Sequence, residues 1–346
     1  TQKGYSKAPD YDAFWVERDY LRRAADFRAA VLIGHGWQDY NVKQDEGVAL
    51  FEALREDDPA TPEVEGVPLK RMFLTQGTHG MGGGAPWTSL QREFFDRYLK
   101  GEDTGVEQAP AVQTIGRTVS DSGAYTSLPM RGEDAWPPVG TTERNLWIRR
   151  TFDQDAPVEL PPPGTGETGT LDPQANTTTT DNIFTWVDAG AVSEEWTTRD
   201  PLNGPGHGYY SLFHQSAPLD APLRMAGRAV LDAYVRAGNG ATLTPVLVDV
   251  APDGTLTTVA RGFLNVDYRD GLETAKPAGT AWVHARVKFL PQDVTFAKGH
   301  RIGLLLQSSN TVWALPGTPA GPVNIAMGAV PNVTETGSKL VLPVVP

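Results

Sequence analysis

The sequence predicts a chain of two parts, an α/β part over residues 1–107 and an all-β part over residues 108–346. Up to about residue 105, short apolar runs that end in glycine alternate with segments of helical spacing. This alternation is typical of α/β domains. From about residue 111 onward, short β-rich runs are separated by turn residues, and long helical periodicity is absent. Such a pattern favours a β-sandwich, and we expect a jelly roll.

The α/β part contains two predicted strands and three predicted helices. A helix over residues 11–28 leads into a buried parallel strand at 29–33, which is a short apolar run before glycines. Apolar residues near helical spacing predict a second helix over 44–54. A second buried strand follows at 69–74, and a last helix spans 87–99. The last helix is followed by a lysine and a glycine, which favour a helix end.

The all-β part contains five clear strands. They are residues 145–148, 229–235, 244–250, 281–287 and 302–306. A Pro-Asp-Gly sequence at residues 252–254 predicts a hairpin turn between two strands.

Composition excludes several classes of function. Hydrophobic residues make up 40% and charged residues 21%, so a packed core is expected. The formal charge of −12 argues against nucleic acid and anionic membranes as partners. No apolar run is long enough to span a membrane. The absence of cysteine excludes disulfides and thiolate sites, and no histidine pair has metal-ligand spacing. We therefore expect no metal and no cofactor.

Two glycine-rich turns follow the two predicted strands. Residues 34–42 have the sequence GHGWQDYNV, and residues 77–80 have the sequence GTHG. The carboxyl ends of parallel strands are where α/β sheets build their sites. Asp39 in the first turn is therefore a candidate for the acid that orients a catalytic histidine. The alternative is that Asp39 only caps the following helix.

His79 in the second turn is the matching candidate base. Gly77 and Gly80 stand on either side, and glycine lets a backbone bend so that a ring projects into a cleft. Asp39 and His79 are 79 − 39 = 40 residues apart, which is one helix and one strand, so they should lie on neighbouring strand ends. The alternative is a loop histidine bonded to a carbonyl. We expect His35 to be structural and to pack beneath the site.

Four residues near this pair are candidates for substrate binding: Trp37, Tyr40, Asn41 and Trp87. The alternative for the aromatic residues is a place in the core, where aromatic side chains near a turn are more often found.

The third member of a Ser-His-Asp triad is missing. In an α/β-hydrolase the serine precedes the acid and the histidine, but only Ser6 precedes Asp39, and no G-x-S-x-G sequence occurs. A base and its orienting acid cannot perform acyl transfer without a nucleophile. Residues 1–107 are therefore interpreted as the C-terminal part of an α/β-hydrolase domain.

Three segments resemble one known family. Residues 34–42 are similar to the acid turn of Xaa-Pro dipeptidyl-peptidases, which are related to cocaine esterase and to α-amino-acid ester hydrolases. Residues 14–20 resemble the segment before that strand. Residues 298–304, with Ser308 and Ser309, resemble a late strand of the family's C-terminal jelly roll. The resemblance extends from about residue 11 to the end of the chain.

The resemblance implies that Asp39 is the triad acid and His79 the triad base of a serine peptidase. The substrate would be a peptide with a penultimate proline, from which an N-terminal dipeptide is released. The family's serine elbow, oxyanion-hole tyrosine and helical cap have no match here, so we expect an N-terminal fragment to supply the serine and the oxyanion hole. We expect a cleaved precursor whose pieces stay associated. An esterase or acylase of the same superfamily, and a non-catalytic β-sandwich binding module, remain alternatives.

Overall fold

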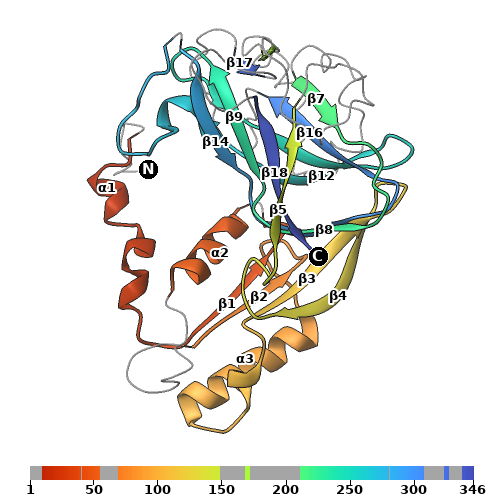
Figure 1. Ribbon diagram of the computed structural model, residues 1–346. Coiled ribbons are helices and arrows are strands. Elements are labelled where there is room, and N and C mark those ends of the chain that lie inside the picture. Colours follow the sequence, from red (N-terminus) through yellow and green to blue (C-terminus); the bar gives the residue numbers. More distant parts are fainter. Residues whose placement is uncertain are drawn as a thin grey trace. The chain divides into compact units, whose positions relative to one another are not determined.

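The computed structural model describes residues 10–39, 41–54, 69–148, 168–171, 211–279, 281–307, 323–326 and 337–346. The chain divides into two compact units (Figure 1). Unit 1 comprises Thr1–Arg117, Ser127–Thr141 and Pro291–Asp293. Unit 2 comprises Thr118–Thr126, Thr142–Leu290 and Val294–Pro346. Because both units draw on separate stretches of sequence, a single boundary at residue 107 stays a prediction.

Unit 1 contains a parallel sheet with helices between its strands. Its main elements are β1 (Val31–Gly36), α2 (Gln44–Ala53), β2 (Lys70–Thr75), α3 (Gly84–Lys100), η2 (Val106–Gln108) and β3 (Val112–Val119), and β4 (Tyr125–Glu133) pairs with β3. β1 is parallel to β2, and β2 is parallel to β3. The last residues of β1 and β2, Gly36 and Thr75, stand opposite each other. The predicted order of strand, helix, strand, helix is confirmed.

The two long helices of unit 1 cover opposite faces of its sheet. Leu32 of β1 belongs to the same apolar cluster as Leu90 of α3. The next residue, Ile33, and also His35 lie against Gly47 of α2. Successive side chains of a strand point to opposite faces, so α3 covers one face and α2 the other. Figure 1 shows them on either side of β1 and β2.

The predicted helix over residues 11–28 is wrong as a single element. The structure has two short helices there, α1 (Ala13–Val16) and the 3-10 helix η1 (Tyr20–Asp26). Asp12 and Asp19 each accept a hydrogen bond from the backbone N–H two residues further on. Each aspartate therefore starts a helix, and a cap in the middle of the segment divides it.

The predicted last helix of unit 1 is confirmed as α3, but only part of its apolar spacing faces the core. Leu90 and Phe94 are buried, whereas Phe95, Tyr98 and Leu99 are exposed.

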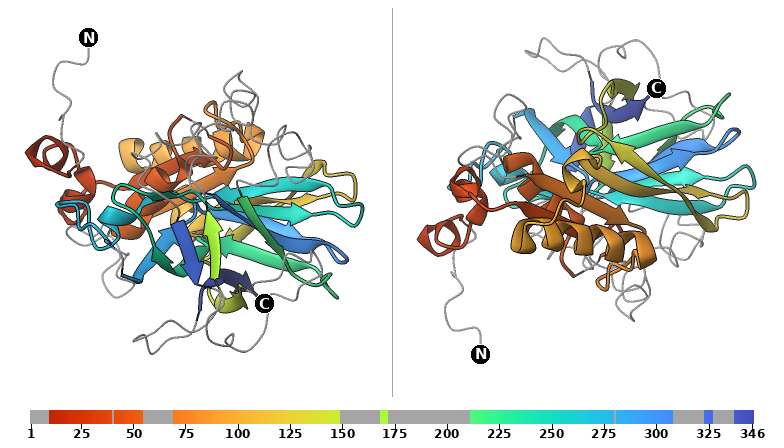
Figure 2. Two further views of the ribbon diagram at one scale, coloured as in Figure 1. Left: turned by 90° about the horizontal axis from the view of Figure 1, so that it is seen from above. Right: turned by 90° about the horizontal axis from the view of Figure 1, so that it is seen from below.

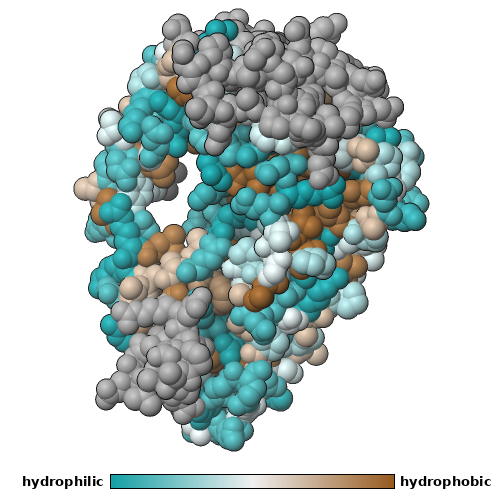
Figure 3. Space-filling model, in the orientation of Figure 1, coloured by the Kyte–Doolittle hydropathy of each residue, from teal (hydrophilic) through white to brown (hydrophobic). Residues whose placement is uncertain are grey.

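On the face of the molecule seen in Figure 3, hydrophobic residues lie in separate places among hydrophilic ones.

Unit 2 is built almost entirely from antiparallel strands (Figure 2). They are β5 (Thr142–Trp147), β6 (Thr168–Leu171), β7 (Ser211–Gln215), β8 (Leu223–Gly227), β9 (Val230–Arg236), β10 (Thr242–Leu243), β11 (Val246–Val250), β12 (Leu256–Arg261), β13 (Leu264–Asn265), β14 (Val283–Lys288), β15 (Gln292–Phe296), β16 (Arg301–Gln307), β17 (Val323–Ala326) and β18 (Lys339–Val345), with the 3-10 helix η3 (Val266–Tyr268). The first two residues of β15, Gln292 and Asp293, belong to unit 1. One sheet has the order β12-β11-β16-β7. In another, β14, β9, β18 and β5 are neighbours, with β17 also on β9 and β8 on β18. The five predicted strands are confirmed as β5, β9, β11, β14 and β16, with shifted bounds.

The two large sheets of unit 2 share one apolar core. Leu247 and Leu304 belong to the first sheet, and Leu231, Ala285 and Leu340 belong to the second, yet all five lie in one buried cluster. Alternate residues of each strand supply this core, as the period of a half-buried strand requires. The all-β prediction for this part is confirmed for the described residues. The jelly-roll connectivity stays a prediction.

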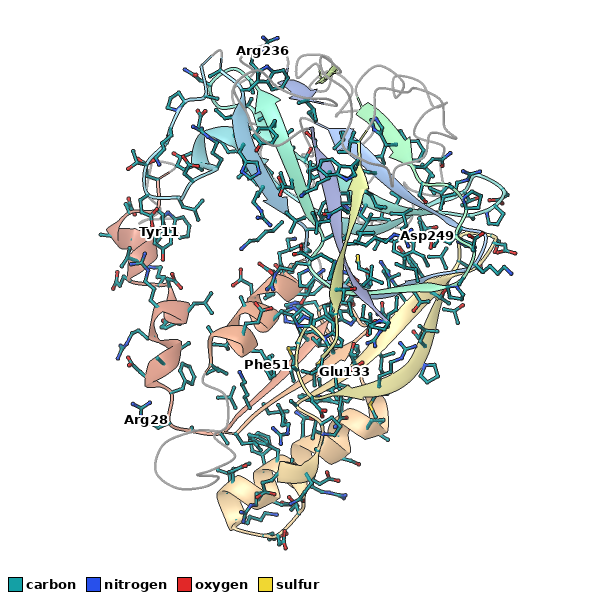
Figure 4. The ribbon with its side chains drawn as sticks, viewed as in Figure 1. Tyr11, Arg28, Phe51, Glu133, Arg236 and Asp249 are labelled. Carbon is teal, nitrogen blue, oxygen red and sulfur yellow. The ribbon has the colours of Figure 1, made fainter. Side chains whose placement is uncertain are left out.

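A histidine is buried between two carboxylates in unit 2. His300 is fully buried; its Nδ1 lies 2.6 Å from Asp249 Oδ1, and its Nε2 lies 3.0 Å from Asp121 Oδ1. Asp249, on β11, is labelled in Figure 4. Burial alone lowers the pKa of His300, but the hydrogen bonds to the two carboxylates raise the pKa by more in sum. The ring therefore binds its second proton more readily than an ordinary histidine.

This arrangement makes the stability of the chain depend on pH. A histidine whose pKa is raised on folding stabilises the fold below its unfolded pKa of about 6.5, and the stabilisation is lost as pH rises through the folded pKa. We expect Asp121→Asn to lower the free energy of unfolding at pH 6 by up to about 1 kcal/mol, since the Asp121 side chain is largely exposed. The loss should disappear in strongly alkaline solution. Urea unfolding at a series of pH values measures it, with the exposed Asp220→Asn as the control; a loss independent of pH would contradict the interpretation.

Candidate active site

The turn after β1 holds Asp39 in place through backbone groups. Asp39 Oδ1 accepts hydrogen bonds from the backbone N–H groups of Asn41, at 2.9 Å, and Val42, at 3.1 Å. The N-cap position of α2 belongs to Lys43, so Asp39 does not cap that helix. Asp39 is only 6% exposed. Its second oxygen, Oδ2, is left for a partner outside the turn.

The turn after β2 is closed by Thr75. Its hydroxyl donates to Met81 O and accepts from Gly77 N. A Cβ at Gly77 would lie 1.8 Å from Met81 O, so only glycine fits at this position. His79 stands inside the loop that this contact closes.

The two turns pack directly against each other. Gln38 N donates to Gly77 O at 3.0 Å, and the Gln38 and Gln76 side chains are bonded at 3.1 Å. A Cβ at Gly36 would lie 2.3 Å from Gly77 O. The glycines at the strand ends therefore allow two backbones to approach closely, which fixes one turn relative to the other.

The structure brings Asp39 and His79 together. His79 Nδ1 lies 3.0 Å from Asp39 Oδ2. Burial alone raises the pKa of Asp39, but the hydrogen bonds from His79 and from the backbone of the turn lower it by more in sum, so the pKa lies below its ordinary value. The carboxylate is therefore ionised at neutral pH and accepts a hydrogen bond from the Nδ1–H group of His79. This leaves the lone pair of a neutral ring on Nε2.

The His79 side chain is exposed to solvent. Its side chain is 56% exposed, whereas Asp39 is buried. An exposed imidazole whose Nδ1–H is held by a buried carboxylate can take a proton at Nε2 and stabilise the resulting charge. His79 can therefore act as a general base, with Asp39 as the acid that orients it.

The other predicted site residues lie in different surroundings. Trp37 is 1% exposed, its ring packs on Trp136 at 5.3 Å, and its Nε1 lies 3.4 Å from Thr114 Oγ1. The Trp37 side chain is therefore part of the core of unit 1, and its contact with substrate stays a prediction. Asn41 is exposed beside Asp39. Tyr40 lies outside the described residues.

Trp87 is half-buried at the start of α3. Its ring packs on Phe73 at 5.3 Å. A Cβ at Gly34 would lie 2.7 Å from the Trp87 ring, so this glycine makes room for it. Trp87 therefore has a packing role within the sheet-and-helix layer of unit 1, and substrate contact stays a prediction.

A segment distant in sequence supports the acid turn within unit 1. Gln292, which is buried, donates from Nε2 to Trp37 O at 3.1 Å. Gln44, at the start of α2, donates from Nε2 to Pro291 O at 3.4 Å. Asp293 accepts from Thr114 Oγ1 at 3.1 Å. Sequence reasoning missed these residues, because no local pattern indicates that residues 291–293 fold with unit 1.

Two kinds of feature are absent from the part of the chain that the structure describes. No group of three or more histidine, cysteine, aspartate or glutamate side chains there could hold a metal ion. No helix among these residues is both long enough and apolar enough to cross a membrane.

Two family models match the sequence. The model of the X-Pro dipeptidyl-peptidase C-terminal non-catalytic domain matches residues 104–340. The model of X-Pro dipeptidyl-peptidase (S15 family) matches residues 1–81. The first match includes the strands of unit 2 up to the start of β18, and the second includes Asp39 and His79.

Known proteins agree with these matches. A Bacillus cereus protein that carries the name Xaa-Pro dipeptidyl-peptidase is 33% identical over 311 residues, which are 88% of this chain and 46% of that protein. A Rhodopirellula baltica protein of the same name is 25% identical over 329 residues, which are 91% of this chain and 46% of that protein. Cocaine esterase of a Rhodococcus species is 24% identical over 335 residues, which are 87% of this chain and 52% of the esterase. The chain spans about half the length of the curated relatives it matches.

Solved structures show the same fold. A CocE/NonD family hydrolase from Staphylococcus aureus has a TM-score of 0.70 at 14% identity, covering 98% of this chain and 58% of that one. An α-amino acid ester hydrolase has a TM-score of 0.65 at 17% identity, covering 97% of this chain and 59% of that one. The fold and the relatives define the class, which is that of serine hydrolases with peptidase and esterase members. Within this class, the chain belongs to the X-Pro dipeptidyl-peptidase family.

The tight turn after β2 gives a prediction about its glycines. Gly77→Ala should lower the free energy of unfolding by about 2 kcal/mol or more, because its Cβ would collide with the backbone oxygen of Met81. Gly80→Ala should change it by less than about 0.5 kcal/mol, since no atom lies within 4 Å of a Cβ there. Denaturant unfolding of the two variants compares substitutions three residues apart; equal losses would contradict the packing described.

Proposed function

We propose that this chain supplies the acid and the base of a serine peptidase that releases N-terminal Xaa-Pro dipeptides. The observation that carries the proposal is the hydrogen bond between His79 Nδ1 and Asp39 Oδ2, at the ends of neighbouring parallel strands. Family membership supports the substrate class, since both matching family models describe X-Pro dipeptidyl-peptidases.

The mechanism is acyl transfer in two steps. As the serine Oγ bonds to the carbonyl carbon of the proline residue, His79 Nε2 takes the serine proton and the carbonyl oxygen gains the electron pair. When the C–N bond breaks, the same proton passes from Nε2 to the leaving amine. Water then attacks the acyl-enzyme as His79 Nε2 takes one of its protons. The ester bond to the serine breaks, and that proton passes from Nε2 to the serine Oγ. Asp39 stays ionised throughout and holds the Nδ1–H group.

The nucleophile belongs to polypeptide outside this sequence. No G-x-S-x-G motif occurs in these 346 residues, and a base with its acid needs a serine to attack the substrate. We propose that an upstream or companion polypeptide supplies the serine and the oxyanion hole, and that cleavage of a precursor separates it from this chain. The all-β part, from about residue 108, is proposed to have jelly-roll connectivity.

An esterase is the second candidate function. Similarity to the Rhodococcus cocaine esterase favours it, because the same acid and base can serve ester hydrolysis. An amide releases an amine and an ester releases an alcohol. The two leaving groups differ in how strongly they need a proton as they leave. Both substrates share the serine attack that His79 assists.

The first test substitutes the acid and the base in the complete enzyme, meaning this chain together with the polypeptide that carries the serine. His79→Ala and Asp39→Asn should each lower kcat for an Xaa-Pro-arylamide by at least roughly four orders of magnitude. His284→Ala is the matched control, because His284 forms a similar pair with Asp232 in unit 2, with 2.6 Å between Nε2 and Oδ1. Full activity of the His79 variant would contradict the proposal and favour a binding module.

Substrate choice and processing have separate tests. Comparison of kcat/KM for Xaa-Pro-arylamides and simple aryl esters separates peptidase from esterase, and hydrolysis of esters alone would refute the peptidase assignment. For the processing, the purified natural enzyme on a denaturing gel should show two bands. A single band that carries both the serine and Asp39 would contradict precursor cleavage.

A further inference from the structure

His35 lies beside Asp39 on the face of β1 that α2 covers. Its Nε2 is 3.0 Å from Val42 O and 3.8 Å from Asp39 Oδ2. The side chain is only 10% exposed. Because a carbonyl oxygen can only accept, Nε2 must carry a hydrogen and donate it to Val42 O. His35 is therefore a donor at this nitrogen and is not placed to act as a base there.

The bond to Val42 completes a chain of hydrogen bonds that ends at His79. His35 Nε2–H donates to the carbonyl of Val42, and the N–H of the same residue donates to Asp39 Oδ1 at 3.1 Å. Asp39 Oδ2 accepts from His79 Nδ1 at 3.0 Å. Both polar backbone groups of Val42 are thus used to fix the carboxylate that orients the His79 ring.

Gly47 of α2 provides the space for the His35 ring. A Cβ at this position would lie 2.8 Å from His35 Nδ1 and 3.4 Å from Ile33 Cγ2. Glycine inside a helix costs about 1 kcal/mol relative to alanine, so its presence is explained by the imidazole that it accommodates. The helix itself is held in place, since Lys70 Nζ donates to Phe51 O and Leu54 O at its C-terminal end. Figure 4 labels Phe51 on this helix.

We propose that His35 is a positioning residue, which fixes the acid turn through Val42 so that Asp39 holds the correct tautomer and orientation of His79. This inference rests on the proposed function, in which Asp39 and His79 serve a serine nucleophile. His35 touches no reacting atom. Its contribution is to fix the position of the Asp39 carboxylate. Displacement of such a group by about 1 Å costs on the order of 100-fold in rate.

The test compares two variants of His35 in the complete enzyme. His35→Phe keeps a ring of similar shape but cannot donate, and it should lower kcat for an Xaa-Pro-arylamide by about 10- to 100-fold with KM within about 3-fold of the parent. His35→Gln places an amide donor near the original Nε2 and should restore kcat to within about 3-fold of the parent value.

A spectroscopic measurement on the same enzyme follows His79 directly. With ¹⁵N-labelled histidine, two-dimensional NMR distinguishes the tautomer that carries hydrogen on Nδ1 from the one that carries it on Nε2. The parent and His35→Gln should show His79 in the Nδ1–H form. In His35→Phe, His79 should lose this preference, because Asp39 is no longer held.

Gly47→Ala tests the same idea while His35 remains in the chain. Its Cβ should displace the imidazole, so kcat should fall although alanine favours the helix. In a His35→Ala background the added methyl group meets no ring, and Gly47→Ala should have no further effect on kcat. Additive losses in this double-mutant cycle would show that Gly47 does not act through His35 and would overturn the proposal.

Two other results would also overturn it. One is a His35→Phe enzyme with parental kcat and an unchanged His79 signal. The other is an equal loss of kcat in His35→Phe and His35→Gln with His79 still in the Nδ1–H form, which would mean a purely structural role. Failure of the proposed function is recognised separately, since Asp39→Asn would then hydrolyse the substrate normally, while the His79 signal in the His35 variants still decides the positioning.

Discussion

The candidate site depends on the close approach of two backbone turns at the end of a parallel strand pair. Gly36 and Thr75 are opposite each other in the register of β1 and β2, so the residues after them leave the sheet at the same edge. The turns then touch at Gly36 and Gly77, where no Cβ would fit. A side chain at Gly36 would push the turns apart, and one at Gly77 would collide with Met81 O inside the second turn. Either change would move Asp39 and His79 relative to each other.

Asp39 combines burial with ionisation, which oppose each other. A buried carboxylate loses the solvation of its charge, and this raises its pKa. Three donors in the structure offset that loss: two backbone N–H groups on Oδ1 and His79 on Oδ2. The net pKa is lowered. His79 lowers the pKa of Asp39 most, and the two backbone donors of the acid turn add to its effect. The acid turn therefore both positions the carboxylate and helps to keep it charged.

The sequence predicts the strand-end pair because its signals are local. Apolar runs followed by glycine indicate parallel strands, and a separation of 40 residues indicates neighbouring strand ends. The burial of Trp37 depends on Trp136 and on residues 291–293, which no local pattern places beside it. The division of residues 11–28 into two helices depends on Asp19 acting as a cap, a choice that apolar spacing does not reveal.

Three histidine–aspartate pairs show that contact with a carboxylate is not sufficient to make a histidine a general base. His300 has carboxylates at both ring nitrogens and is fully buried, so it has no lone pair to offer. His284 lies on β14, directs its Nε2 at Asp232 and stacks on Tyr234, and its side chain is 41% exposed. Only His79, among these three, has its Nδ1 held by a buried acid while the rest of its ring projects from a turn into solvent. A general base needs an oriented ring with an accessible lone pair. The His79 ring is oriented by Asp39 and lies at the end of a parallel strand pair, the part of an α/β sheet where active sites are built.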